Sequence, residues 1–224
     1  ELASVWDDFA NDTNLWVAVL TGAGEKAFCA GNDLKATASE GRAKLPESGF
    51  LGLTQRFDLD KPIIAAVNGF AMGGGFETAL SCDIIIASEI AKFALPEVKV
   101  GFIAAAGGVQ RLSRYIGRLA AHEMIMTGRT VNASEALRRG IVNAVVPHSD
   151  LLEKAMFKAE EIASVSPSAI KATKSILNSL IIEEHLPESL AFSRDVVSDL
   201  AKTEDFTEGV NAFVEKRKPK WVNR

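Results

Sequence analysis

Four short apolar runs, spread over the first two thirds of the chain, constrain its fold more than any other feature. Each run is rich in valine, isoleucine or alanine and is short enough to be one buried strand. The runs lie at residues 16–20, 62–69, 83–88 and 140–147. Helical stretches separate them, and strands that alternate with helices predict an α/β architecture with mostly parallel pairing.

The last third of the chain changes character and is predicted to be mostly helical. Cap residues and apolar spacing predict helices that begin at Asn132, Asp150 and Ser166, and a last helix around Val210. Gly140 is the expected end of the first of them. We therefore expect an α/β core over residues 1–145 and a helical C-terminal region over 146–224.

Composition excludes several classes of protein. The chain has 224 residues, of which 47% are hydrophobic and 24% charged, so it can bury a core without disulfides or a metal. Cys29 and Cys82 form no framework, which favours a reducing compartment and predicts a cytoplasmic protein. A net charge of −4 argues against nucleic acid as a partner.

Targeting signals are also missing from the printed sequence. No run approaches the roughly 18 apolar residues of a membrane helix, so no membrane partner is expected. The first residues lack the basic start and apolar stretch of a signal peptide. Because they resemble a helix already under way, we expect a further N-terminal piece in the whole protein.

Two segments have alternative interpretations. Residues 22–27 (GAGEKA) match a dinucleotide fingerprint, but the residues that follow do not open a helix. A tight turn is the better prediction there. Residues 36–49 combine Gly, Pro, Ser and charges without periodicity, which predicts a mobile loop, either an ordinary surface loop or a lid.

Two glutamates stand beside glycine-rich turns. Glu77 follows three glycines between a predicted strand and helix. Such a turn either allows close packing or presents free N–H groups to negative charge, and Glu77 itself would be favoured by the helix dipole without any catalytic role. Glu97 follows a proline in apolar, glycine-rich sequence, so it is either a solvated helix-start residue or a buried carboxyl suited to proton transfer.

The sequence contains no further motif for nucleophilic, nucleotide-phosphate or zinc chemistry. The chain lacks G-x-S-x-G, P-loop and H-E-x-x-H sequences. Its histidines, His122, His148 and His185, are dispersed, and no metal site is predicted.

Four segments, in order and at matching spacing, resemble the motifs of the enoyl-CoA hydratase/isomerase (crotonase) family. They are 27–34 (AFCAGNDL), 61–77 (KPIIAAVNGFAMGGGFE), 93–101 (FALPEVKVG) and 208–217 (EGVNAFVEKR). The resemblance implies a crotonase-like spiral of ββα units with a C-terminal helical trimerisation region, and a homotrimer or dimer of trimers. The family's opening strands, which carry part of its coenzyme A site, have no counterpart in this sequence.

The resemblance also implies a site and a reaction. Backbone N–H groups of Asn32 and Gly74 would form an oxyanion hole, and Glu77 and Glu97 would hold the reacting water. The implied substrate-binding residues are Ala30, Asn32, Asp33, Leu34, Lys35, Gly73 and Gly74. The substrate is an acyl-CoA thioester, and coenzyme A belongs to it, so no separate cofactor is expected.

The chain departs from the usual family sequence at one segment of this site. Relatives usually have Pro-Gly or Pro-Asp where this chain has Ala104-Ala105, in a segment that lines the active site. The placement of water there is therefore open.

Since isomerases of the family often keep only one of the two glutamates, the pair favours reversible addition of water to a 2-enoyl-CoA. Residues 31–36, 59–77 and 218–221 are similar to the carnitinyl-CoA dehydratase branch. Carnitinyl-CoA dehydration and enoyl-CoA isomerisation are the alternatives within the family. A branch that binds RNA is the non-enzyme alternative, which the acidic balance disfavours.

Overall fold

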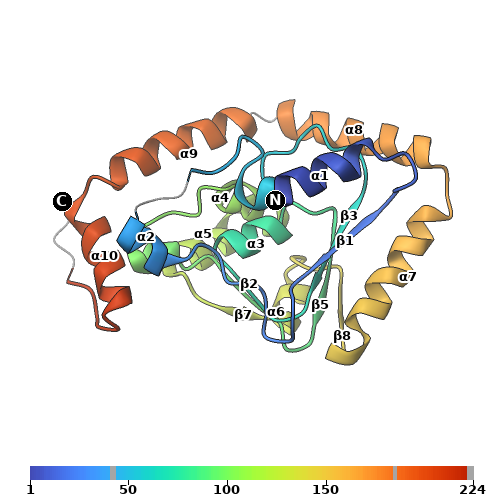
Figure 1. Cartoon of the computed structure of the whole chain (residues 1–224). Helices are drawn as coiled ribbons and strands as arrows, with labels where there is room; N and C mark the ends of the chain where they lie inside the picture. Colours follow the sequence, from blue (N-terminus) through green and yellow to red (C-terminus); the bar gives the residue numbers. More distant parts are fainter. Residues whose placement is uncertain (41–43, 184–185, 221–224) are drawn as a thin grey trace.

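The computed structural model of this chain describes residues 1–40, 44–183 and 186–220 (Figure 1). Residues 41–43 of the predicted loop, His185 and the end of the 218–221 segment lie outside these ranges. Within them, no helix is long and apolar enough to cross a lipid bilayer.

Two four-stranded sheets form the centre of the molecule. The first has the order β1 (Ala18–Thr21), β3 (Ile63–Val67), β5 (Ile84–Ser88) and β8 (Ala144–Val146), all parallel. These are the four apolar runs of the sequence, so the predicted parallel sheet is confirmed. The second sheet has the order β2 (Ala27–Cys29), β4 (Phe70–Met72), β6 (Lys92–Ala94) and β7 (Val131–Asn132), with only β7 antiparallel to its neighbour.

The chain passes from the first sheet to the second, into helix, and back to the first sheet. One such turn is β1–β2–α2 (Leu34–Glu40), and the next is β3–β4–α3 (Gly74–Ala79). The third turn is β5–β6, followed by the 3-10 turn η2 (Glu97–Val100) and helices α4 (Gly108–Ile116) and α5 (Arg118–Thr127). This is the predicted spiral of ββα units. Because β2, β4 and β6 are parallel neighbours, the segments that leave them emerge at the same edge.

The core lies on both faces of the first sheet. Alternating strand residues such as Ile64 and Ile86 pack outward against Leu151 and Ala155 of α7 (Leu151–Ala163). Residues of the opposite parity face the second sheet and α3, where the Phe76 and Phe93 rings lie 5.3 Å apart. Helix α1 (Leu2–Asn11) closes one side with buried Trp6 and Phe9.

The C-terminal helices begin where the cap residues predicted. Asn132 caps α6 (Ala133–Arg138) by accepting the Glu135 N–H at 2.8 Å, and α8 (Pro167–Glu183) starts after Ser166. Two further helices follow, α9 (Leu186–Leu200) and α10 (Glu204–Val214). Figure 1 shows α8 and α9 running one after the other along the top of the molecule, and α10 turning back beside α2. Helix α9 had not been predicted, and the division at residue 145 falls inside β8.

The structure corrects the loop predicted over 36–49 and supports the turn predicted at 22–27. Residues 36–40 are helical, because the Asp33 carboxylate accepts the N–H groups of Lys35 and Ala36 at 2.9 and 3.1 Å and so starts α2. After Gly22 the chain turns into strand β2 rather than a helix. The Asn68 side chain holds this turn through bonds to Gly22 and to the Gly24 carbonyl, the latter at 2.7 Å.

Candidate active site

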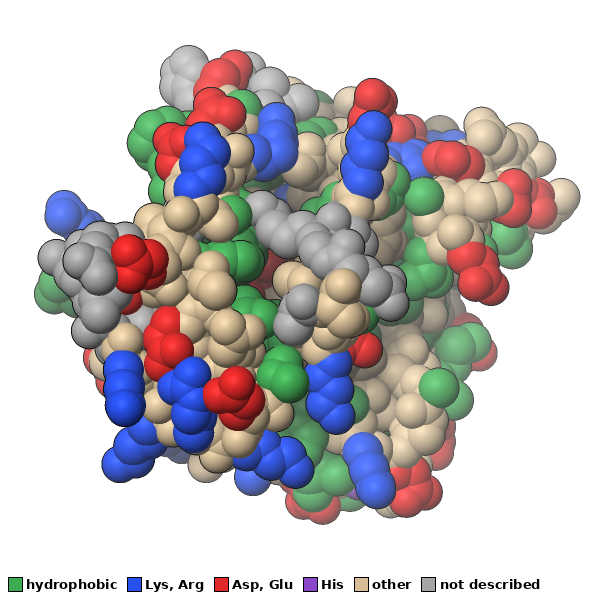
Figure 2. Space-filling model, turned by 60° about the vertical axis from the view of Figure 1, so that its left-hand side comes forward, with side chains coloured by type: hydrophobic (Ala, Val, Ile, Leu, Met, Phe, Trp, Pro, Cys, Tyr) green, Lys and Arg blue, Asp and Glu red, His purple; other side chains and the backbone are tan. Residues whose placement is uncertain are grey.

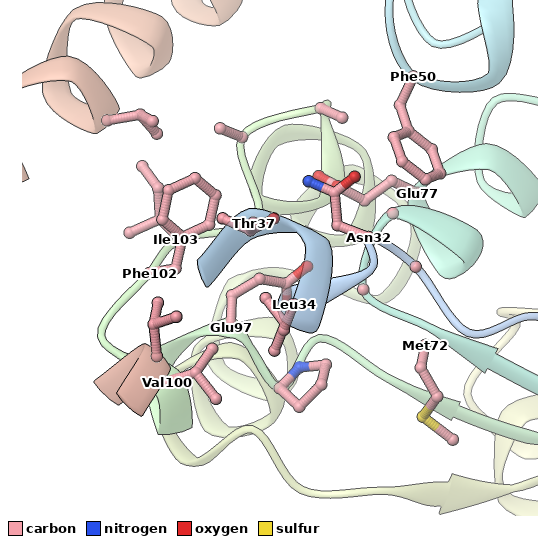
Figure 3. Close-up of a pocket in the computed structure, with 18 of the residues that line it drawn as sticks. Asn32, Leu34, Thr37, Phe50, Met72, Glu77, Glu97, Val100, Phe102 and Ile103 are labelled. Atoms are coloured by element: carbon pink, nitrogen blue, oxygen red, sulfur yellow. The ribbon is translucent and has the colours of Figure 1, made fainter. Parts of the chain in front are cut away.

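A cavity of about 1070 Å³ lies where the segments leaving β2, β4 and β6 meet. Asn32, Gly74, Glu77 and Glu97 all line it. The close-up in Figure 3 shows Glu77 and Asn32 on one side and Glu97 below them, next to Leu34 of α2. The spiral therefore gathers at one cavity residues that are up to 65 positions apart in the sequence.

Glu77 lies in the first turns of α3 and is only 3% exposed. Its Oε1 accepts the backbone N–H of Gly108 at 2.8 Å. A side chain at position 108 would bring its Cβ to 2.9 Å from that oxygen, so glycine lets the start of α4 approach the carboxyl closely. This contact fixes one oxygen of Glu77.

Glu97 begins η2, directly after Pro96. Its Oε1 lies close to Gly73, where an added Cβ would be 2.8 Å away. Its Oε2 is buried and has no hydrogen-bond partner among the described residues. A buried carboxyl oxygen without a partner at a cavity wall is suited to receive a hydrogen bond from a water or a substrate.

Burial raises the pKa of both carboxyls, and the charge of Glu97 raises that of Glu77 further. The pKa of Glu77 is raised to about 8, first by burial and then by the negative charge of Glu97. Backbone N–H groups and the Arg111 charge act in the opposite direction. Burial also raises the pKa of Glu97, to about 7. Since two close carboxyls resist ionising together, the pair retains a proton near neutral pH.

Two backbone N–H groups stand near this pair. The N–H groups of Asn32 and Gly74 enter no hydrogen bond found among the described residues. The loops that carry them are close, since a Cβ at Gly31 would be 2.8 Å from the Met72 carbonyl oxygen and 3.4 Å from the Gly74 nitrogen. Position 31 also has a φ of +88°, so both its conformation and its neighbours require glycine there.

The remaining predicted binding residues divide into two groups. Ala30, Leu34 and Gly73 line the cavity, whereas Asp33 and Lys35 do not. Asp33 is the cap of α2, and Lys35 is exposed on the first turn of that helix. In the segment that departs from relatives, Ala105 lines the cavity and Ala104 is buried behind it.

The sequence did not predict that some residues would line this cavity. The Phe50 ring packs against Gly74, and its backbone N–H is held by the Thr54 hydroxyl at 2.9 Å. Val197 of α9 and Val210 of α10 also line the cavity, so the C-terminal helical region, to which the family resemblance assigns trimerisation, also covers this site. No motif surrounds Phe50 or Val197, whereas Val210 lies in the segment 208–217 that resembles the family. Only the folded chain brings the three residues to the cavity.

The comparisons with known proteins agree with this architecture. Residues 1–224 match the family model described as enoyl-CoA hydratase/isomerase. The chain belongs to this family. It is therefore an enzyme of a family that acts on coenzyme A thioesters, and its fold is the crotonase fold.

Relatives and solved structures give the same result. The chain is 46% identical to a carnitinyl-CoA dehydratase of Proteus mirabilis, over 100% of this chain and 88% of that protein. It is 47% identical to one of Salmonella typhi, over 97% and 85%. A carnitinyl-CoA hydratase structure from Mycobacterium avium is similar with a TM-score of 0.92 and 41% identity, over 100% of this chain and 87% of that one. An enoyl-CoA hydratase structure from Bacillus anthracis has a TM-score of 0.75 and 39% identity over the same shares.

The raised pKa of Glu77 predicts a pH-dependent stability. Below the unfolded pKa near 4.5 the carboxyl is protonated in both states and its full contribution is present. As pH rises toward 8, the unfolded chain releases this proton first, so the free energy of unfolding falls. Glu77→Gln removes the titration, and its stability relative to the parent chain should increase by about 1 kcal/mol or more between pH 5 and pH 9.

Urea unfolding at several pH values measures this difference. Glu89→Gln, at an exposed position after β5, is the control and should differ from the parent by a constant amount. If the free energy of unfolding of Glu77→Gln differs from that of the parent by the same amount at every pH from 5 to 9, then Glu77 is not a buried carboxyl that titrates in this range.

Proposed function

We propose that this enzyme catalyses the reversible addition of water to a 2-enoyl-CoA thioester. The observation that carries the proposal is a pair of glutamates on one cavity, the buried Glu77 and the half-buried Glu97, beside two backbone N–H groups that have no partner among the described residues. Each part corresponds to one requirement of the reaction: proton transfer at two carbon centres, and stabilisation of negative charge on the thioester oxygen.

The oxyanion hole is formed by the N–H groups of Asn32 and Gly74. Addition of water to Cβ moves negative charge onto the thioester oxygen, and donors fixed at that position stabilise the enolate. One such donor typically contributes about 3–4 kcal/mol to transition-state stabilisation. Because both donors belong to the backbone, the side chain of Asn32 is not required for this role.

Glu77 and Glu97 hold one water between them. The ionised glutamate takes a proton from the water while the water oxygen bonds to Cβ of the substrate. The protonated glutamate delivers its proton to Cα. Dehydration of the 3-hydroxyacyl thioester is the same sequence in reverse. The reaction needs one ionised and one protonated carboxyl, which is the state that the raised pKa values favour near neutral pH.

Coenzyme A enters as part of the substrate. Lys99 and Arg194 line the cavity and supply positive charge suited to phosphates. Figure 2 shows Lys and Arg side chains gathered on the face beside α10 and α2, next to a hollow with apolar side chains. Ala30, Leu34 and Gly73 line the cavity and would contact the thioester, whereas Asp33 and Lys35 lie beside it at the start of α2. The reaction needs no further cofactor, and the free cysteines Cys29 and Cys82 suit the cytoplasm.

Carnitinyl-CoA dehydration is the more specific candidate. The relatives at 46–47% identity carry that name. The cavity is lined by four phenylalanines, Phe50, Phe102, Phe206 and Phe213. Aromatic rings attract quaternary ammonium groups, so this lining is compatible with the trimethylammonium group of crotonobetainyl-CoA.

Replacing either glutamate by glutamine is expected to abolish efficient turnover while the chain stays folded. Loss of one general acid or base lowers kcat by about 10²–10⁴-fold, because glutamine neither takes nor delivers the proton. The assay follows the enoyl absorbance of crotonyl-CoA or crotonobetainyl-CoA, with circular dichroism to verify folding. Glu89→Gln is the matched control with normal activity. Near-normal hydration by Glu97→Gln, or no activity of the parent on any enoyl-CoA, refutes the proposal.

The choice of acyl group is tested by competing substrates. If the phenylalanine-lined cavity receives the trimethylammonium group, kcat/KM for crotonobetainyl-CoA should exceed that for crotonyl-CoA by about tenfold or more. Phe102→Leu should reduce this ratio while leaving crotonyl-CoA hydration within a few-fold. Equal kcat/KM values for the two thioesters in the parent chain assign a general enoyl-CoA hydratase instead.

A homotrimer or dimer of trimers is the expected assembly. Large apolar side chains are exposed on the C-terminal helices, among them Phe157 at 59%, Ile176 at 63% and Phe192 at 69%. Closed symmetric contacts would cover such surface. Light scattering at micromolar concentration should give three or six chain masses, and Phe157→Glu should lower that mass. A monomer mass for the parent contradicts the proposed assembly.

A further inference from the structure

Arg111 is a buried cation that the mechanism above does not use. It lies one turn into α4 and is 7% exposed. Burial of a guanidinium is costly unless its donors and its charge are compensated. Its contacts therefore indicate what it supports.

The guanidinium joins two segments of the cavity wall. One nitrogen donates to the Thr54 carbonyl at 2.8 Å and another to the Ala106 carbonyl at 3.3 Å, and the group lies 5.8 Å from the Phe57 ring centre. Gly107 makes the approach possible, because a Cβ there would be 2.0 Å from the Arg111 nitrogen.

Both of these segments reach the proposed catalytic groups. Thr54 holds Phe50, whose ring packs on Gly74, and Ala106 lines the cavity beside Glu77. The start of the same helix, α4, donates the Gly108 N–H to Glu77. One side chain thus supports the wall on both sides of the buried carboxyl.

The charge of Arg111 also acts on Glu77. It favours the ionised carboxylate and opposes the effects of burial and of Glu97. Tyr115, Cys82 and Arg114 are the other titratable or charged groups that act on Arg111. Asp83 affects Tyr115 and Cys82 and is itself paired with Lys174 at 2.8 Å. Among the groups that shift the pKa of Glu77, Arg111 is the cation.

We propose that Arg111 is a positioning residue for the glutamate pair: it fixes the wall segments at Thr54 and Ala106, and its positive charge favours the ionised form of Glu77. The proposal rests on the proposed function only for its effect on turnover. Its effect on the ionisation of Glu77 is independent of any substrate.

The substrate-free test is a ¹³C NMR titration of the full chain labelled at glutamate side-chain carboxyls, with Glu77→Gln used to assign the Glu77 signal. Arg111→Gln removes the charge, and the Glu77 midpoint should rise above that of the parent chain. Arg111→Met is a second uncharged variant with an apolar chain, in case the first does not fold. Arg111→Lys keeps a charge and should leave the midpoint near that of the parent. A folded, uncharged variant with an unchanged midpoint overturns the proposal.

The pH profile of hydration separates positioning from ionisation. In an uncharged variant the profile of kcat/KM should move to higher pH, whereas Arg111→Lys should lower kcat about tenfold or more without moving the profile. An equal loss in both variants with no shift indicates a purely structural residue and overturns the proposal. If the parent chain hydrates no enoyl-CoA, the proposed function fails, and the NMR titration still decides the role of Arg111 in ionising Glu77.

Discussion

Parallel pairing of β2, β4 and β6 is the constraint on which the rest of the site depends. Hydrogen-bonded parallel neighbours lie about 4.8 Å apart and end at the same edge, so the segments that follow them are forced into contact. In this chain those segments carry Asn32, Gly74 and Glu97. Their convergence therefore follows from the register of three very short strands, and no long-range contact between the side chains themselves is needed to create it.

Such convergence is possible only where side chains are missing. A Cβ at Gly75 would lie 2.1 Å from the Cys29 carbonyl oxygen, so the first turn of α3 can pack on the exit of β2 only with glycine at that position. This close packing also buries Glu77, which follows two residues later. The glycine-rich turn thus has two linked effects. It leaves backbone N–H groups without partners among the residues that the structure describes, and it places a carboxyl where water does not stabilise its charge.

Local sequence predicted the first sheet well because β1, β3 and β5 have four or five residues and β8 lies within a longer apolar run, 140–147. The strands of the second sheet have only two or three residues, as in β7 (Val131–Asn132), and periodicity has no meaning over so short a run. The two glutamates were found as candidates beside glycine-rich turns, but their convergence and the roles assigned to them came from the family resemblance. Phe50 and Arg111 were missed, because their contacts with the site depend on the folded chain: Phe50 packs on Gly74, and Arg111 bonds to Thr54, 57 residues away.

The C-terminal helices connect the outer surface of the molecule to the chemistry of the cavity. Val197 of α9 and Val210 of α10 are buried and line the same cavity as the two glutamates. Apolar cover on that side reduces the access of water to the carboxyls, and reduced hydration is the first cause of the raised pKa values of both. The position of these helices therefore influences how tightly the pair holds its proton. Since α8 and α9 also carry exposed apolar side chains, an assembly that covered them would stabilise the closed cavity as well, and the proton affinity of the site would depend on contacts made far outside it.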